Sequence, residues 1–514
     1  MFRAALRRRP GRQPNNPGRN RNSPEFGKYR IPAEFFSGRK IAFRELVWYF
    51  KDKTAAPGGG SQVGYGRRSD WRPGHEETMS PVRGAIMTMR RRVEWNNMND
   101  RRVVITGCGA ISCVGNSVAE LWDAVSNGRC GIGRITRFDT TGFRSELAGE
   151  VKNFDITRYM SAKDAKRMDL FCQYAIAAAD EALAQAGLPL MDENFQDDRD
   201  RIGVLVSSGI GGLGSMCEQD AVFFEKGPSR ISPLMIPMMI GDLAAGNLSM
   251  RYQAKGPNFG LVSACASGCH SIGEAYWMIK RDDADVMLAG GAEAAIVPLG
   301  YAGFCSMKAM SARNNDPLHA SRPFDAGRDG FVMSEGAGVM VIEELEHARK
   351  RGAVILAEIV GYGATGDAYH ITSPHPEGAG AAQAIRMALK HAGLAPEAVD
   401  YINAHGTSTE LNDKFETLAI KAALGAHADK VSISSTKGAT GHALGAAGGI
   451  ESIVCVQAIN AGLVPPTINY ETPDPDCDLD ITPNRARERK IDVALNINLG
   501  FGGHNGVVAF KRFV

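Results

Sequence analysis

Short apolar runs alternate with longer helical segments from residue 102 to the C-terminus. Arg102–Gly107 is an apolar run ended by glycine, which predicts a buried strand, whereas the alanine-rich segment Phe171–Ala186 predicts a helix. Further elements of this first series are predicted strands at Arg201–Val206, Asn258–Val262, Ala284–Ala289 and Gly338–Glu343, and a helix from Cys265 to about Ile279. This alternation predicts a layered α/β fold with mostly parallel strands.

A second series of the same kind begins near Ala353. It predicts strands at Val354–Val360, Val399–Ile402, Val431–Ser434, Asp492–Asn498 and Gly506–Phe510, and helices at Gly380–Ala392, Asp413–Leu424 and Ala443–Ala461. No stretch of 18 apolar residues lacks a charge or polar break, so we expect no membrane span. In open α/β sheets the chemistry gathers in loops that leave the carboxyl ends of strands.

The first 97 residues differ in composition from the rest. They contain 17 Arg and 4 Lys against 8 acidic residues, so the whole chain's net charge of +2 leaves residues 98–514 at −11. Little periodicity runs through this basic leader, which favours an unstructured extension or an over-long start over an organelle transit peptide or a nucleic-acid-binding arm. We assign it no function and expect no nucleic-acid partner.

Ten cysteines are scattered through the chain without CxxC pairs. That pattern argues against a disulfide framework or a zinc ribbon and suits a reducing compartment. A bacterial-type cytoplasmic location is therefore expected, with organelle import through the leader as the alternative.

Cys265 lies between a predicted short strand and a helix, flanked by small residues. A thiol at a helix N-terminus gains from the helix dipole and from free backbone N–H groups, which lower its pKa and favour the thiolate. The ordinary fate of a cysteine is burial in a core, so the position alone is weak evidence for a nucleophile. Cys269, one helical turn later, provides a structural control.

Two histidines also follow predicted strands. His405 stands in the segment Asn403–Thr409 and His442 ends the segment Ser434–His442, and both have Gly and Thr neighbours. A single histidine is usually structural, but two in equivalent loops suggest a shared role. Asp413 and Glu416 are the nearest candidates for a metal site, yet their spacing is not that of a zinc motif, and we expect no metal.

The glycine loop Gly500–Gly503 ends the last long strand segment. Such a loop suits a backbone N–H aimed at a developing oxyanion, with Phe501 as a movable cover, although a plain turn has the same composition. Neither this loop nor Gly209–Gly214 matches a dinucleotide-binding GxGxxG motif, which disfavours nucleotide binding.

Together these segments resemble the β-ketoacyl-acyl carrier protein synthases of the thiolase superfamily, most closely synthase II. The resemblance runs from about Arg102 to the C-terminus. Its motifs are Val103–Gly107, Ser208–Gly212, Ala264–Gly268, Arg322–Asp325, Arg328–Phe331, Glu335–Gly338, the two histidine segments and Gly500–Asn505. Several independent motifs in the family's order make a specific signal.

The resemblance implies a five-layered αβαβα fold made of two similar halves, residues 98–353 and 354–514, in a homodimer. It implies decarboxylative condensation of malonyl-acyl carrier protein with an acyl group held on Cys265, without a cofactor beyond the carrier's phosphopantetheine. The backbone N–H groups of Cys265 and Phe501 would form the oxyanion hole. His405 and His442 would bind the malonyl thioester carbonyl and stabilise the enolate.

Other roles follow from the same resemblance. Lys437 and Glu451 match a network that supports the histidines, and Phe501 matches a gating residue. The positions that match substrate-binding residues are Ile210 for the acyl pocket and Thr407 and Thr409 for the pantetheine arm, while Lys166 and Arg167 match residues presented to the acidic carrier protein. Three departures from the common pattern, Ala266, Asn412 and His504, leave the acyl substrate open.

Four other interpretations were weighed. A free-standing type II ketosynthase of a polyketide or specialised lipid pathway keeps the fold and the chemistry. A degradative thiolase would use a second cysteine in place of one histidine, and a non-catalytic chain-length subunit would lack Cys265. A cysteine hydrolase would need one Cys–His pair oriented by Asn or Asp, so the two-histidine pattern favours condensation.

Overall fold

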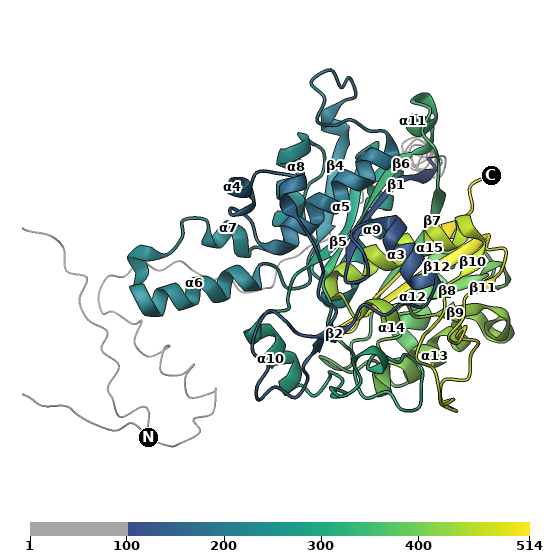
Figure 1. The fold of residues 1–514 in the computed structure, drawn as a ribbon. Coiled ribbons are helices and arrows are strands. Elements are labelled where there is room, and N and C mark those ends of the chain that lie inside the picture. The colour runs from purple at the N-terminus through teal and green to yellow at the C-terminus, as the bar shows by residue number, and fades with distance from the viewer. Residues whose placement is uncertain (1–100) are drawn as a thin grey trace, which may run out of the picture. The chain divides into compact units, whose positions relative to one another are not determined.

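The computed structural model describes residues 101–514, and the leader of residues 1–97 lies outside the described residues. Nine strands form one sheet in the order β4-β5-β6-β1-β7-β13-β12-β8-β9 (Figure 1). Their bounds are β1 Val103–Ser112, β4 Ile202–Ser207, β5 Val286–Glu293, β6 Gly336–Glu344, β7 Ala357–Gly366, β8 Tyr401–Asn403, β9 Ser432–Ser434, β12 Val493–Gly500 and β13 His504–Lys511.

The prediction of mostly parallel strands is wrong for this sheet. Only β4 with β5, β12 with β8, and β8 with β9 run parallel, while the other five neighbouring pairs are antiparallel. Nearly every residue of these strands is buried. A strand of this kind is a continuous apolar run in the sequence, whether its neighbour in the sheet is parallel or antiparallel to it. The pattern therefore locates strands without giving their pairing.

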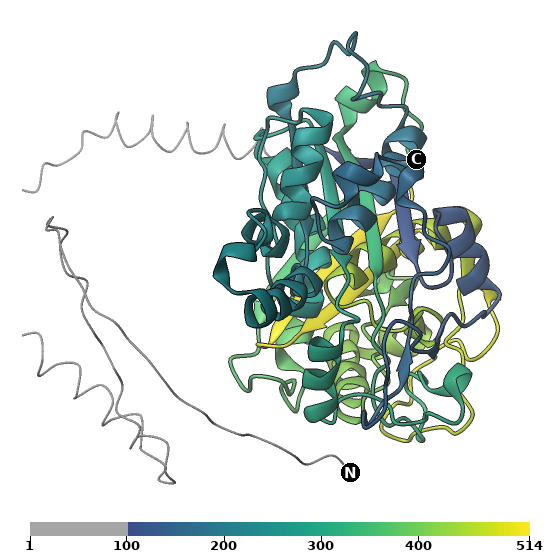
Figure 2. The ribbon, with the colours of Figure 1, turned by 60° about the vertical axis from the view of Figure 1, so that its left-hand side comes forward.

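The predicted five layers are present. One apolar cluster packs helices α5 (Leu170–Ala186) and α8 (Leu243–Tyr252) against one face of the strands β4, β5 and β6. A second covers the strands β7, β12 and β13 with α12 (Ala379–Ala392) and α13 (Glu410–Leu424). Between them, α9 (Ser267–Lys280) and α15 (Ala447–Ala461) contribute to a central cluster shared by strands of both groups. A second view of the ribbon shows helices on both sides of the long strands (Figure 2).

Helix α5 shows how local sequence sets an element's limits. The Asp169 side chain accepts a hydrogen bond from the Phe171 N–H at the N-terminus, and the chain leaves the helix at Gly187 with φ +64°. Between these caps every alanine except the exposed Ala184 is buried. The small side chains let the helix lie close to β1, where the carbonyls of Ala178 and Ala182 leave no room for a side chain at Gly109 or Gly107.

Two predictions for the segment after β4 need correction. Asn258–Val262 does not form a strand, because only Asn258 makes a bridge, to Val204 of the edge strand β4. The helices α6 (Leu213–Lys226) and α7 (Met235–Met239) were not predicted from the sequence. They have few buried residues, so the apolar stripe that reveals a packed helix is missing.

The remaining elements are short. They are α3 (Val118–Ser126), α4 (Ala162–Ala165), α10 (Pro298–Ser306), α11 (Leu345–Lys350), α14 (Lys437–Thr440), and the strand pairs β2 (Gly133–Arg134) with β3 (Leu147–Ala148) and β10 (Leu463–Val464) with β11 (Arg487–Glu488).

Among residues 101–514, one helical window, Leu444–Ala461, is long and apolar enough to cross a membrane, with a mean hydropathy of 1.3. It includes the central-layer helix α15, and 83% of the window is buried inside the protein. Its apolar surface is therefore covered by protein on most sides.

Candidate active site

Cys265 lies in a strained turn at the start of the central layer. The 3₁₀ turn Ala264–Ala266 leads directly into α9, and Ala264 adopts φ +51°, a left-handed conformation unusual for alanine. The backbone N–H groups of Cys265 and Phe501 both act on the Cys265 sulfur and lower its pKa. The sulfur thus faces two donors from separate segments of the chain.

The glycine that precedes Phe501 permits this approach. A Cβ atom at Gly500 would stand 2.4 Å from the Ser263 carbonyl oxygen and 3.3 Å from the Cys265 nitrogen. Gly500 is the last residue of β12, so the end of this strand lies directly against the nucleophile turn. Only a residue without a side chain fits between them.

The expectation of a thiolate at Cys265 is wrong for the resting site. Burial raises the pKa of the thiol to about 12, and the positive charge of Lys437 and the two N–H groups only partly oppose it. Cys265 lies among apolar side chains such as Leu444 and Phe331. Desolvation therefore outweighs the favourable position at the helix end, and the resting group is a neutral thiol.

His405 and His442 lie side by side. Their ring centroids are 5.2 Å apart at an interplanar angle of 87°, and both residues are buried. Burial lowers both pKa values well below 6.5, and Lys437 lowers them further. Both imidazoles are therefore neutral at physiological pH, and each can offer one N–H as a hydrogen-bond donor.

Each histidine is held through its backbone. The carboxylate of Glu416 on α13 accepts hydrogen bonds from the N–H groups of His405 (2.6 Å) and Gly406 (2.7 Å). The N–H of His442 donates to the Val332 carbonyl at 2.7 Å, and its ring packs edge-on against Phe331. Glu416 was considered only as a metal ligand in the sequence, but the structure uses it to fix the His405 loop.

A buried ion pair supports the two rings. Lys437 on α14 pairs with Glu451 on α15, and the Asn498 amide donates to Glu451 at 2.6 Å. Burial raises the pKa of Glu451, while Lys437 and Asn498 oppose the shift. The pair brings a positive charge close enough to influence Cys265 and both histidines.

One cavity of about 360 Å³ joins these groups. Its lining includes the predicted residues Cys265, His405, His442, Thr407, Thr409 and Phe501. Phe304, Phe331 and Leu444 add an apolar wall that the sequence did not single out, because aromatic and leucine residues are common in any core. Five predicted residues do not line this cavity. They are Lys437 on α14 and Glu451 on α15, Ile210 in the loop after β4, and Lys166 and Arg167 just beyond α4.

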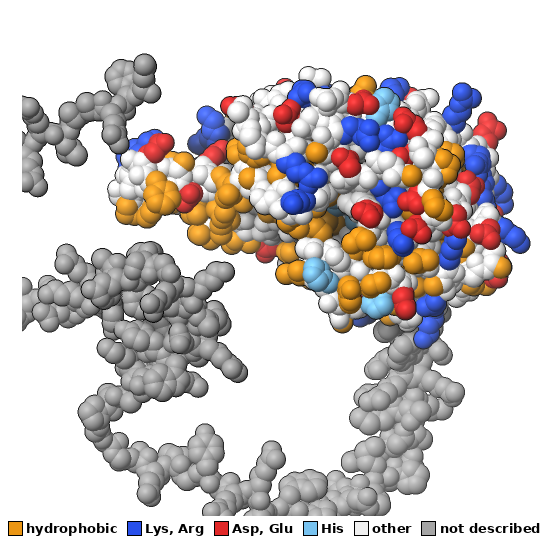
Figure 3. All heavy atoms as spheres, turned by 90° about the horizontal axis from the view of Figure 1, so that it is seen from below, with side chains coloured by type: hydrophobic (Ala, Val, Ile, Leu, Met, Phe, Trp, Pro, Cys, Tyr) orange, Lys and Arg blue, Asp and Glu red, His pale blue; other side chains and the backbone are white. Residues whose placement is uncertain are grey.

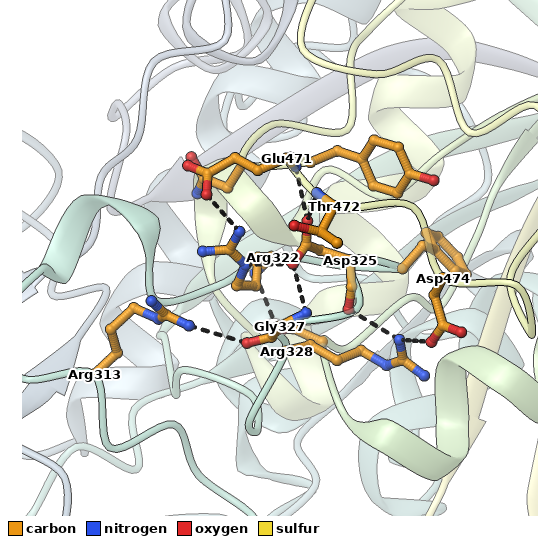
Figure 4. A network of polar contacts seen from close by, with 12 residues as sticks. Arg313, Arg322, Asp325, Gly327, Arg328, Glu471, Thr472 and Asp474 are labelled. Atoms are coloured by element: carbon orange, nitrogen blue, oxygen red, sulfur yellow. Dashed lines mark hydrogen bonds and ion pairs between the residues drawn. The ribbon is translucent and has the colours of Figure 1, made fainter.

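A polar network lies next to the cavity and includes Arg328 of its lining (Figure 4). The carboxylate of Asp325 accepts hydrogen bonds from the Arg322 side chain and from the backbone N–H groups of Gly327, Glu471 and Thr472. Arg328, which lines the cavity, pairs with Asp474. Two segments far apart in sequence are thus tied together next to the cavity.

The three departures from the family pattern lie in or near the same region. Ala266 is fully buried in the nucleophile turn. Asn412 lines the cavity and donates to the Asp413 carboxylate at 3.1 Å. His504 is exposed at the start of β13, beyond Phe501. None of them replaces Cys265 or either histidine.

Comparison with known proteins agrees with this geometry. The family model described as Beta-ketoacyl synthase, N-terminal domain matches residues 100–348, and the model for the C-terminal domain matches residues 356–471. A 3-oxoacyl-[acyl-carrier-protein] synthase 2 of Synechocystis sp. is 53% identical over 417 residues, which are 81% of this chain and 99% of that protein. The corresponding protein of Coxiella burnetii is 48% identical over 81% of this chain and 99% of its own length.

Solved structures show the same fold. A ketosynthase described with its type II polyketide acyl-carrier protein has a TM-score of 0.74 and 36% identity, covering 80% of this chain and 100% of that chain. A β-ketoacyl synthase from Burkholderia phymatum has a TM-score of 0.75 and 34% identity, with the same coverage.

The chain therefore belongs to the β-ketoacyl synthase family of condensing acyltransferases. Within that family it stands with the 3-oxoacyl-[acyl-carrier-protein] synthase 2 relatives, which it matches at about half of all positions along almost their whole length.

Proposed function

We propose that the protein elongates fatty acyl chains by two carbons, condensing malonyl-acyl carrier protein with an acyl group held on Cys265. The observation that carries the proposal is the single cavity that contains one thiol and two neutral imidazoles. A hydrolase would need one Cys–His pair and water, whereas a carbon–carbon bond needs a second carbonyl site beside the acyl thioester.

In the first step the Cys265 sulfur attacks the acyl thioester of the carrier. A thioester forms on Cys265, the carrier's thioester bond breaks, and the pantetheine thiol leaves with the proton that Cys265 gives up. The tetrahedral intermediate carries a negative oxygen, which the N–H groups of Cys265 and Phe501 would stabilise. Both groups already act on the sulfur in the resting site.

In the second step malonyl-carrier loses carbon dioxide. The electron pair of the broken carbon–carbon bond forms an enolate, whose oxygen would accept hydrogen bonds from His405 and His442. Neutral imidazoles suit this role because each keeps one N–H group, which can donate a hydrogen bond to the enolate oxygen. The enolate carbon attacks the acyl group on Cys265, and the sulfur leaves as the 3-oxoacyl product forms.

Other residues take supporting roles in this proposal. The hydroxyls of Thr407 and Thr409, 3.0 Å apart in the cavity lining, would bind the amides of the pantetheine arm. Ile210 would line the acyl pocket. Lys166 and Arg167, outside the cavity, would present positive charge to an acidic acyl carrier protein.

We also propose that the protein acts as a homodimer. Hydrophobic side chains gather on the arm formed by α6 and α7 (Figure 3), where Phe224 is 78% exposed. Val262, next to the nucleophile turn, is 67% exposed and belongs to the segment beside the edge strand β4. Apolar side chains next to an open sheet edge form a surface that a second copy would cover.

We further propose that the protein works in fatty acid synthesis and in a reducing compartment of the cell. Identity near one half to 3-oxoacyl-[acyl-carrier-protein] synthases, against 36% for a polyketide ketosynthase, supports fatty acid synthesis over a polyketide pathway. All ten cysteines are unpaired. This supports a reducing, bacterial-type cytoplasmic location, with organelle import as the alternative.

The direct test is mass spectrometry of carrier cargo after mixing the protein with medium-chain acyl-carrier and malonyl-carrier. We expect a 3-oxoacyl product two carbons longer, which Cys265→Ala abolishes. Cys269→Ala is the matched control, because Cys269 is buried one helical turn away and does not line the cavity. It should keep elongation. An unacylated Cys265 and no product from the folded protein would refute the proposal.

The histidines separate the two steps. His405→Ala and His442→Ala should still accept the acyl group on Cys265. Their rate of malonyl decarboxylation should fall by about 100-fold or more, which is the usual effect of removing one hydrogen-bond donor to a developing oxyanion. Radiolabelled carbon dioxide release and acyl-enzyme mass measure the steps separately. Equal loss of both steps would contradict the assigned roles.

A further inference from the structure

A buried carboxylate outside the cavity connects the two segments that shape it. Glu293 ends β5 and is fully buried, and it does not line the cavity. No Lys, Arg or His side chain of residues 101–514 forms an ion pair with it. A buried charge with no counter-ion is costly unless hydrogen bonds satisfy it.

Hydrogen bonds to Glu293 come from two loops. One carboxylate oxygen accepts from the Ser208 hydroxyl at 2.7 Å, and the other accepts from the N–H groups of Gly209 (2.9 Å) and Gly445 (3.0 Å). Ser208 and Gly209 belong to the loop that carries Ile210. Gly445 belongs to the 3₁₀ turn Leu444–Ala446, which follows His442 and places Leu444 in the cavity wall.

These contacts leave no free space between the segments. A Cβ atom at Gly445 would stand 2.3 Å from the Gly209 nitrogen, and one at Gly209 would stand 3.1 Å from the Ala264 carbonyl oxygen. The nucleophile turn, the Ile210 loop and the turn after His442 therefore meet around one carboxylate. Gly209, which donates to the carboxylate, is also the residue that approaches the nucleophile turn most closely.

The charge state of Glu293 decides whether all of the bonds form. Its two oxygens serve as acceptors only, while Ser208 donates to it and accepts from the Gly211 N–H at 2.7 Å. A proton on the carboxyl group would sit on the oxygen that faces Ser208, since the other oxygen already receives two N–H groups. The new Glu293 O–H and the Ser208 O–H would then both lie between the same two oxygens, where only one proton fits. The Ser208 hydroxyl could no longer donate to Glu293, so the Ile210 loop would lose this hydrogen bond.

We propose that Glu293 is a positioning residue whose ionised carboxylate clamps the Ile210 loop to the turn after His442 and so sets the room for the acyl chain. The proposal rests on the proposed function in taking Ile210 as part of the acyl pocket. The proton that releases the clamp binds near neutrality, because burial raises the pKa of Glu293 to about 7. Its hydrogen-bond donors oppose that shift.

Other titratable groups surround these segments. They are Cys265 before α9, Asp169 facing Gly212 from the start of α5, and Lys437 and His442 before the Leu444–Ala446 turn. Glu293 itself raises the pKa of Cys265, so the rate of any single thiol reaction mixes both titrations. Two reagents that react with the same thiol depend equally on the fraction of thiolate at Cys265. Dividing one rate by the other therefore cancels the Cys265 titration.

The test uses two alkylating reagents that need neither carrier nor condensation, iodoacetamide and N-octyl iodoacetamide. The rate of modification of Cys265 is measured for each by peptide mass from pH 6 to pH 8. In the unaltered protein we expect the ratio of octyl to short reagent to fall at least threefold as pH rises, because the ionised clamp holds the Ile210 loop in place. Because no carrier takes part, this result is independent of whether the protein elongates malonyl units.

Glu293→Gln keeps the size of the side chain and mimics the protonated acid, so its ratio should stay at the pH 6 value throughout. Glu335→Gln is the matched control: it alters another fully buried glutamate, which contacts Tyr174 and Arg137, and should keep the pH dependence. A ratio that does not change with pH in the unaltered protein, or one that changes equally in Glu293→Gln, would overturn the proposal. Ser208→Ala, which removes the relaying hydroxyl, should weaken the pH dependence and serves if Glu293→Gln folds poorly.

Discussion

At the scale of single residues, Cys265 shows two opposing influences on one thiol. The helix end, two N–H groups and Lys437 favour the thiolate, whereas burial among apolar side chains favours the thiol and dominates. The resting thiol is therefore mostly protonated. We infer that the reactive form appears only when a substrate brings its carbonyl to the two donors.

This balance predicts the pH dependence of alkylation. With a pKa raised to about 12, the fraction of thiolate at Cys265 should grow about tenfold per pH unit above about pH 8, where Glu293 is already ionised. The iodoacetamide rate at Cys265 should therefore rise without a plateau up to about pH 10. Glutathione, measured in parallel, should level off near its own lower pKa. A plateau at Cys265 below pH 8 would contradict the dominance of burial.

At the scale of elements, the end of β12 lies against the nucleophile turn. Gly500→Ala should push the two apart, because the new Cβ would meet the Ser263 carbonyl oxygen at 2.4 Å. We expect acyl transfer to fall more than 10-fold and unfolding free energy to fall by about 1–3 kcal/mol, as for other overpacked sites. Acyl-enzyme formation and denaturant unfolding measure the two effects.

Gly133→Ala is the control for that change. Gly133 lies in β2, and a Cβ there would have nothing within 4 Å. It should leave acyl transfer unaltered and change stability by less than about 0.5 kcal/mol. If both variants behaved alike, the close approach at Gly500 would not matter for the reaction.

The ion pair between α14 and α15 makes a separate prediction. Glu451→Leu should lower the free energy of unfolding by about 3–5 kcal/mol, because it leaves Lys437 charged and buried without a partner. Lys437→Met combined with Glu451→Leu should recover most of that stability, since an apolar pair of similar size needs no desolvation. Denaturant unfolding of the single and double variants gives the coupling.

Activity should not follow stability in this cycle. The double variant lacks the positive charge that acts on Cys265, His405 and His442, so we expect condensation to stay at least 10-fold below the unaltered protein. Recovery of activity together with stability would assign the pair a purely structural role.

Local signals in the sequence located the long strands and the central residues of the cavity, Cys265, His405, His442 and Phe501, but not how they are arranged. Cys265, His405 and His442 each stand beside a glycine or alanine between a predicted strand and a predicted helix, and that signal lies within a few residues of each. The partners that hold them, Glu416 and Glu293, come from distant segments, and their spacing carries no local signature. The direction of strand pairing escaped prediction because buried strands look alike in either direction.

At the scale of the whole molecule, the exposed apolar surface beside β4 predicts self-association. Val262→Asp places a charge in the surface proposed to meet a second copy, and it should convert a dimer into a monomer. Light scattering after size exclusion measures the mass. Val354→Asp is the matched control, since Val354 is 72% exposed in the connection before β7, away from this surface. A Val262→Asp dimer of unchanged stability would place the interface elsewhere.

The shared cavity around Cys265 also affects how the enzyme responds to the supply of loaded carrier protein. The donor's pantetheine and the malonyl pantetheine must use the same space in turn, because the nucleophile and both imidazoles line one cavity of about 360 Å³. Carrier protein that has been emptied of its cargo has the same arm and would compete for that space. The rate in the cell would then depend on the ratio of loaded to empty carrier as well as on the amount of enzyme. A shortage of malonyl groups would slow the enzyme in two ways, because less substrate would be present and because more empty carrier would occupy the cavity.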